Sequence, residues 1–198
     1  MNVFKTTLLA TALIAATPLA AQAESQAVTT GNAAARLDFR VTIPRILFLR
    51  VGADSATINL VDFAPTAAQL GDSSVVAGTG GDGTAPGAVT AQVRGNDGNI
   101  TLLATTGGAL SNGAGDTIPY SQILTAATPI TAGALLAAPV LADGASAPLV
   151  LAPTQGSKIT VRDARWTFSY ANSAIVAPGT YGGVDTNNGR VTYTASMP

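Results

Sequence analysis

The acidic side chains that could take part in chemistry lie mostly in turns. One exception is Asp163, which lies between Arg162 and Arg165 in an alternating segment, and a carboxylate with cationic neighbours can act as a general base. A strand face on which these charges pair with one another explains the same residues without catalysis. No second carboxylate is marked out as a partner, although acid–base hydrolysis of a glycoside needs a pair.

Two turns have some features of calcium loops. Residues 80–83 read Gly-Gly-Asp-Gly, but the pattern occurs once and lacks the nonapeptide period of calcium repeats. Residues 185–189 carry oxygen ligands at calcium-loop spacing, but the glycine and the bidentate glutamate of an EF-hand loop are missing. The glycines of residues 78–87 do not open a helix after a strand, as nucleotide binding requires. We expect ordinary turns, with no metal and no cofactor.

The composition excludes further classes of function. The 198 residues include no cysteine and no histidine, so the usual zinc, copper and haem ligands and the Ser-His-Asp and Cys-His arrangements are absent. The 10 Lys and Arg residues against 11 Asp and Glu residues form no basic run, which argues against a nucleic-acid partner. Only 11% of residues are charged, less than half of the usual share of about a quarter. We therefore predict a structural or binding protein and not an enzyme.

The N-terminus predicts export. Lys5 precedes an apolar stretch over residues 8–16, and residues 21–23 read Ala-Gln-Ala, a signal-peptidase pattern. The stretch is shorter than the roughly 20 residues that span a bilayer, and Pro, Gly and Asp interrupt every later one. We expect a signal peptide over residues 1–23, no membrane insertion after its cleavage, and a flexible leader over residues 24–35.

The rest of the chain, residues 36–198, predicts one all-β domain. Short segments that alternate polar and apolar residues are separated by turns rich in Gly, Asn and Asp, which is typical of an antiparallel sandwich. Residues 95–99 form such a turn and predict a hairpin between the strands on either side. The aromatic residues at period two from Trp166 to Tyr170 are interpreted as core, with a carbohydrate-stacking platform as the alternative. The predicted strands cover residues 36–43, 46–49, 57–63, 88–94, 100–105, 117–124, 148–152, 158–170, 179–181 and 190–197.

The first of these segments alternates at every step. Its apolar face consists of Leu37, Phe39, Val41 and Ile43, which a helix would scatter around its axis. Pro44 follows, and then residues 46–49 are apolar on both faces, which suits a strand buried on both sides or packed in a sandwich. The alternation fits equally a first strand that pairs within its own sandwich and a strand that is given to another molecule.

The layout of the two chain ends resembles that of pilins assembled by the chaperone–usher pathway, especially the cysteine-free subunits of the alternate type. An N-terminal extension precedes the sandwich, and residues 179–183, Gly-Thr-Tyr-Gly-Gly, precede an alternating last strand. The Asn96-Asp97-Gly98 turn is similar in placement. The turn at residues 185–189 is longer than in that pattern.

This resemblance implies an immunoglobulin-like sandwich that lacks one strand and is completed by a strand donated from another subunit. Leu37, Phe39, Val41 and Ile43 would then be the donated side chains. The acceptor wall, and before assembly the edge that a chaperone caps, would consist of Val191, Tyr193, Ala195 and Met197. The partners implied are other copies in a homopolymer, a periplasmic chaperone and an outer-membrane usher.

Two functions are therefore open at this stage. The first is a structural subunit of a bacterial pilus or fimbria, exported through the periplasm to a cell-surface fibre used in adhesion. The second is a self-contained secreted sandwich that binds a carbohydrate or a surface partner through its loops. The chain is too short for a second sandwich of a hundred or more residues, as a two-domain tip adhesin would need.

Overall fold

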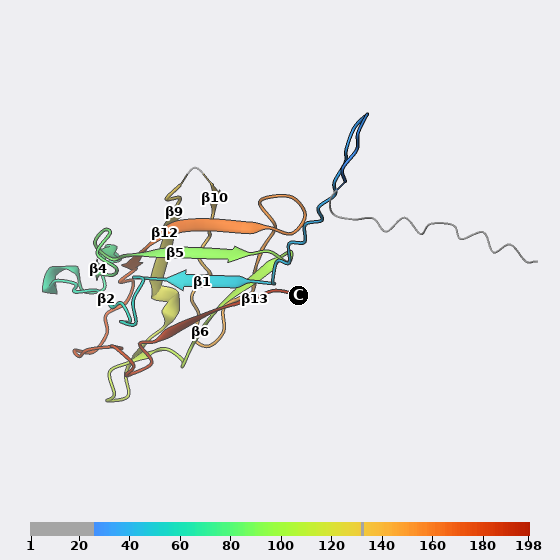
Figure 1. Cartoon of the computed structure of the whole chain (residues 1–198). Coiled ribbons are helices and arrows are strands. Elements are labelled where there is room, and N and C mark those ends of the chain that lie inside the picture. The colour runs from blue at the N-terminus through green and yellow to red at the C-terminus, as the bar shows by residue number, and fades with distance from the viewer. Residues whose placement is uncertain (1–25, 132) are drawn as a thin grey trace, which may run out of the picture. The chain divides into compact units, whose positions relative to one another are not determined.

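The computed structural model describes residues 26–131 and 133–198 (Figure 1). The predicted signal peptide lies outside these residues. The chain divides after Ile43 into two compact units, and the second unit, residues 44–198, contains all the strands. The compact β unit begins at Pro44. Of the first unit, residues 26–43 are described, and none of them lies in a helix or a strand.

The larger sheet is built around its longest strand. This strand, β12 (Thr160–Tyr170), pairs antiparallel with β5 (Ala88–Gly95), which in turn pairs with β1 (Leu47–Val51). The other edge of β12 pairs with β9 (Ile123–Thr128) and, in parallel, with β10 (Ala134–Leu135), while β3 (Val76–Ala77) pairs with its end. The strand β1 is therefore an edge of this six-stranded sheet.

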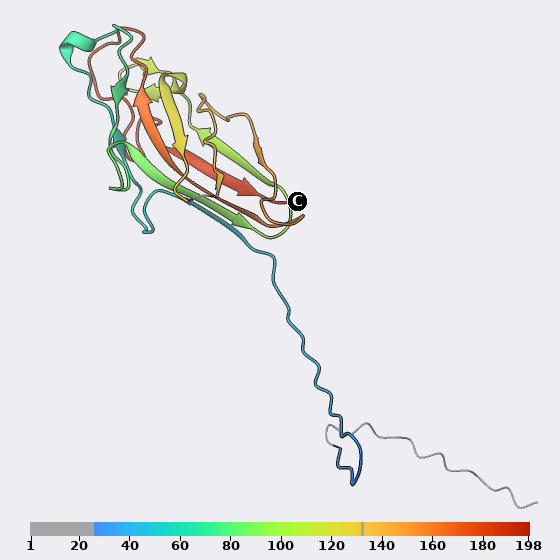
Figure 2. The same cartoon turned by 90° about the horizontal axis from the view of Figure 1, so that it is seen from above.

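The smaller sheet has three antiparallel strands. Its central strand β6 (Ile100–Thr106) pairs with β11 (Leu149–Leu151) on one side and with β13 (Val191–Ser196) on the other. The strand β13 is therefore an edge as well. The long strands of both sheets lie roughly along the same axis (Figure 2). The predicted all-β sandwich is confirmed.

The core lies between the two sheets, where the alternating side chains meet. In β12 the residues Trp166, Phe168 and Tyr170 are buried, so the aromatic face is core and not a stacking platform. The apolar faces of β5 and β6 complete this core, with Val93, Ile100 and Leu102 fully buried. The indole Nε1 of Trp166 donates to the carbonyl oxygen of Leu136 at 2.8 Å, so the one polar atom of this ring is satisfied.

The predicted hairpin at residues 95–99 is wrong. The strands β5 and β6 on either side of this turn belong to different sheets, so the turn crosses between the layers. The reason is that both edges of β5 are occupied, by β1 and by β12. A turn composition predicts a change of direction but does not say which strand becomes the partner.

Two predicted strands are shorter in the structure or do not form. Predicted residues 57–63 reduce to β2 (Val61–Asp62), which pairs with β4 (Thr79–Gly80), and residues 179–181 form no strand. Gly182 follows with φ +77°, a conformation that ends extended backbone. The remaining elements are β7 (Leu110–Ser111), which pairs with β8 (Thr117–Ile118), and two 3-10 turns, Ala67–Gln69 and Tyr120–Gln122.

Within the described residues, no helix has the length and hydropathy needed to cross a bilayer.

Candidate functional site

The two edge strands β1 and β13 lie side by side, although they are far apart in the sequence (Figure 1). Each has one paired side, β1 with β5 and β13 with β6. Within the described part of the chain, no strand pairs with the opposite side of either one. We call these two sides the open edges. Backbone N–H and C=O groups along such an edge are free to pair with another strand.

Burial falls sharply toward the open edges. Core-facing side chains of the inner strands, such as Val93 and Leu102, are fully buried. The core-facing side chains of β1 are less covered: Leu47 is 37% exposed, and Leu49 and Val51 are half-buried. Of the two arrangements that suit this apolar run, β1 adopts packing in a sandwich and not burial on both sides, because Phe48 points outward and is 45% exposed, with Arg94 over its ring.

The predicted acceptor residues all face the core from β13. All four pack against the main core cluster yet remain half-buried: Val191, Tyr193, Ala195 and Met197. The residues between them on β13, Thr192, Thr194 and Ser196, are exposed. The predicted face of this strand is confirmed, and it is a core face that the present strands cover incompletely.

Two contacts connect this face to the larger sheet. The ring of Tyr193 lies 5.2 Å from that of Trp166, centroid to centroid, at a tilt of 48°. At the end of β13, Met197 approaches Gly95 of β5 so closely that a Cβ on Gly95 would lie 2.7 Å from its sulfur atom. Gly95 is the register partner of Leu47 in β1. Gly95 therefore lies next to the first residue of β1 and also next to Met197, which follows β13.

The predicted donor residues are among the most exposed large apolar side chains of the described chain. The exposed fractions of Leu37, Phe39, Val41 and Ile43 lie between 75% and 86%. The segment keeps its sequence alternation but forms no strand within the described residues. Alternation predicts which side chains share a face, but a strand also needs a neighbouring strand to pair with.

A polar loop precedes β13. Burial and the nearby Asp143 raise the pKa of Tyr120 to about 12, and its hydroxyl group donates to the carbonyl oxygen of Asn188 at 2.6 Å. Burial, followed by the neighbouring Tyr120, also raises the pKa of Tyr193. Both tyrosines therefore stay neutral over the ordinary pH range. Both are core side chains, and the Tyr120 hydrogen bond holds the loop against the sandwich.

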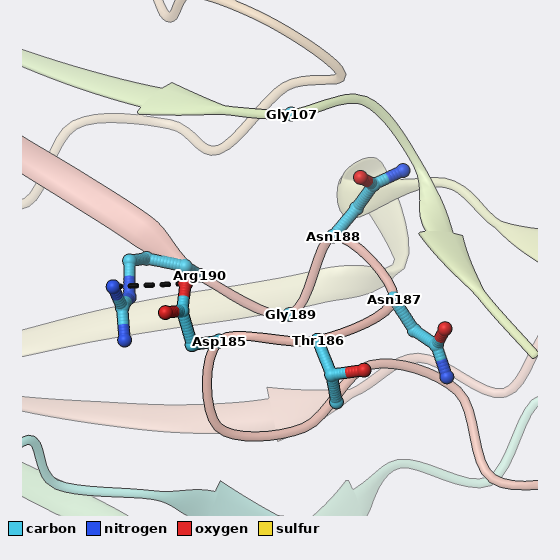
Figure 3. A pocket seen from close by; sticks show the side chains of 7 residues that line it. All are labelled: Gly107, Asp185, Thr186, Asn187, Asn188, Gly189 and Arg190. Atoms are coloured by element: carbon cyan, nitrogen blue, oxygen red, sulfur yellow. Dashed lines mark ion pairs between the residues drawn. The ribbon is translucent and has the colours of Figure 1, made fainter.

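The loop itself, residues 185–190, lines a shallow polar pocket of about 300 Å³ with Gly107 (Figure 3). Asp185 forms an ion pair with Arg190 at 2.9 Å, and three of its residues, Asp185, Asn187 and Asn188, have positive φ. This is a turn whose one carboxylate is engaged by a cation. Within the described residues, no group of three or more Asp, Glu, His or Cys side chains is placed to hold a metal ion.

Asp163 does not form the expected salt-linked face. Its two carboxylate oxygens accept hydrogen bonds from Thr131 Oγ1 at 3.1 and 2.9 Å. Arg162 points to the other side of β12 and donates to the carbonyl oxygens of Leu135 and Ala152. Within the described chain no ion pair joins Asp163 to Arg165. Asp163 also lines a second polar pocket of about 380 Å³ with Thr154 and Gln155.

The glycine-rich turn at residues 80–83 is held by its aspartate. The backbone N–H groups of Thr84 and Thr90 and the Thr84 hydroxyl group donate to the Asp82 carboxylate. Partial burial raises the pKa of Asp82, but these hydrogen bonds outweigh it and lower the pKa to about 2. The carboxylate is saturated by protein donors and fastens the turn to β5.

Comparisons of the chain with protein-family models, with curated proteins and with solved structures found no match.

Proposed function

We propose that this chain is an exported structural subunit of a bacterial surface fibre, in which each copy donates residues 36–43 to the open edges of the next copy. The observation that carries the proposal is a complementary pair of incomplete surfaces. One is the apolar row from Leu37 to Ile43, at least 75% exposed. The other is the half-buried core face between β1 and β13.

Strand donation would bury the exposed apolar row and cover the half-buried core face in a single contact. The backbone of the donated segment would pair with the open edges, and its alternate side chains would enter the core between Leu49 and Tyr193. Burying four such side chains yields about 6–12 kcal/mol, at about 1.5–3 kcal/mol each. The chain has no cysteine, so no disulfide competes with this burial as a source of stability.

The mode of contact determines the type of assembly. A segment donated from one copy to a different surface of the next is a heterologous contact, which grows a filament and not a closed dimer. Before assembly, the same open edges would need protection from aggregation. This is the role expected of a periplasmic chaperone, and an outer-membrane usher would then receive the subunit, with the finished fibre on the cell surface.

A charge on the donor face tests the proposal in the mature full-length chain. Replacing Phe39→Asp introduces a carboxylate that would have to enter the core, which is strongly unfavourable. We expect this variant to be exported and to remain monomeric, with no filaments in electron micrographs.

The matched control is Thr42→Asp, which adds the same charge to the polar face of the same segment. It should assemble as the parent chain does. Filaments from Phe39→Asp at the parental level would contradict strand donation. Glycan binding by a monomer whose residues 36–43 have no influence on its stability would favour the self-contained binding module instead.

A further inference from the structure

We infer that the turn between β5 and β6 holds residues 44–46 in line with β1, and so directs residues 36–43 to a second copy of the chain and away from their own sandwich. We call residues 44–46 the root of the extension. The inference rests on the proposed function, because it concerns which copy receives the donated segment.

The side chain of Asn96 pairs with the root as a neighbouring strand would. Its Oδ1 accepts a hydrogen bond from the Ile46 N–H at 2.9 Å, and its Nδ2 donates to the Pro44 carbonyl oxygen at 2.8 Å. In extended backbone, the carbonyl group of one residue and the N–H two residues later point to the same side. The next pair along is Leu47 with Gly95. Asn96 thus continues the β5 edge, and the root continues β1.

The middle residue of the root is held by charge. The Nε atom of Arg45 lies 3.3 Å from Asp97 Oδ2. A terminal guanidinium nitrogen of Arg45 also donates to the carbonyl oxygen of Pro198, the residue that ends the chain after β13. The Arg45 side chain therefore connects the root both to the turn and to the residues that follow β13.

The turn that holds the root is itself fixed to β12 and the residues before it. Lys158 Nζ lies 2.8 Å from the other Asp97 oxygen, Oδ1, and the Gly98 N–H donates to the Lys158 carbonyl oxygen at 2.9 Å. The hydroxyl group of Thr160, which is fully buried, donates to the Gly98 carbonyl oxygen at 3.1 Å. The root is thus held by a turn that is anchored at several points.

This arrangement opposes self-pairing. For residues 36–43 to reach the open edges of their own sandwich, the chain would have to reverse direction between Ile43 and Leu47. A reversal there takes the root out of its extended conformation and breaks both Asn96 hydrogen bonds. Pro44 adds to the cost, because it has a fixed φ and keeps Ile43 extended. Donation to a second copy leaves all of these contacts intact, so Asn96 and Asp97 act as positioning residues.

The test compares assembly of Asn96→Ala and Asn96→Ala/Asp97→Ala with that of Asn99→Ala in the mature full-length chain. Asn99 is exposed in the same turn and serves as the matched control. The ratio of monomer to polymer after refolding is measured by size-exclusion chromatography, and each monomer is then offered a fluorescent peptide of residues 36–43. A monomer whose own residues 36–43 occupy its open edges cannot bind the peptide. Loss of the two Asn96 hydrogen bonds should raise the fraction of such monomer about ten-fold.

An unchanged ratio, equal to that of Asn99→Ala, would overturn the inference. If the Asn96 variants do not fold, Arg45→Gln decides the question, since it removes the ion pair between the root and Asp97 while every residue of the turn stays in place. It weakens the hold on the root and should raise the peptide-resistant monomer in the same direction. A different result would contradict the proposed function itself: polymers formed by the Phe39→Asp variant. Polymer loss in Phe39→Asp together with parental ratios in the turn variants would refute the inference alone.

Discussion

The ring of Tyr193 lies against that of Trp166, with 5.2 Å between the centroids and a tilt of 48° between the planes. Trp166 is fully buried in the larger sheet, whereas Tyr193 belongs to the open edge strand of the smaller one. This contact joins the two layers next to the open edge of β13. It makes the proposed acceptor face part of the core of the subunit.

Removal of this ring should destabilise the subunit. Tyr193→Ala deletes a large core side chain and its contact with Trp166, and we expect the free energy of unfolding to fall by about 3–5 kcal/mol, as for other aromatic truncations. Tyr193→Phe keeps the ring and should cost less than about 1 kcal/mol. Urea denaturation followed by Trp166 fluorescence measures both. Equal losses in the two variants would show that the hydroxyl group, and not the ring, is the important part.

The stability of the turn at residues 80–83 should depend on acid. The pKa of Asp82 in the folded chain, about 2, lies below its ordinary value of 3.8. Its stabilising contribution is therefore complete above the ordinary pKa and is lost as the pH falls toward 2. We expect the free energy of unfolding to decline less steeply between pH 4 and pH 2 in Asp82→Asn than in the parent chain.

The control for this pH dependence is Asp54→Asn, which removes a carboxylate from an exposed loop. Thermal unfolding at each pH compares the three proteins. A parental slope in Asp82→Asn would mean that the turn is not held by the ionised carboxylate.

Engineered cysteines can locate the donated segment, because the parent chain contains none. A chain carrying Phe39→Cys is mixed with a chain carrying Ala195→Cys and oxidised. The other core-facing positions, Val191, Tyr193 and Met197, are replaced by cysteine in turn. Side chains on one face of adjacent strands lie close enough for a disulfide, so Phe39→Cys should form a cross-linked dimer with at least one of these four positions.

The outward position Thr194→Cys is the control for this cross-linking, since it lies on the exposed face of the same strand. It should remain unlinked on non-reducing gels. Cross-links of equal yield to Thr194→Cys and to the core-facing positions Val191, Tyr193, Ala195 and Met197 would indicate random collision and would contradict donation between the open edges.

Strand positions could be predicted where alternation was long and uninterrupted. The segments that became β5, β6, β12 and β13 were all identified from the sequence, because period-two burial fixes both the strand and its inward face. For the same reason the core role of Trp166 and the inward row from Val191 to Met197 followed from the pattern alone.

Pairing could not be predicted in the same way. Whether the turn at residues 95–99 closes a hairpin depends on which strands already occupy β5, and that is a long-range property. The exposure of Phe48 likewise depends on β1 being an edge with an uncovered outer face. The short strand β4, the partner of β2, was missed, since Gly78 and Gly80 carry no side-chain pattern and allow close backbone approach.

The role of Asn96 also left no sequence signal beyond turn composition. Asparagine is common in turns for local reasons, and its two hydrogen bonds with residues 44–46 join segments fifty residues apart. Only the folded arrangement brings the turn, the root and the chain end together.

The most direct test of strand donation is the melting temperature of residues 44–198 with and without a synthetic peptide of residues 36–43. If the open edges accept this segment, a peptide at about a hundred times its dissociation constant should raise the melting temperature by about 5–10 °C. The same peptide with Phe39→Asp should have little effect. A fragment that melts at the temperature of the mature chain and ignores both peptides would contradict the proposal.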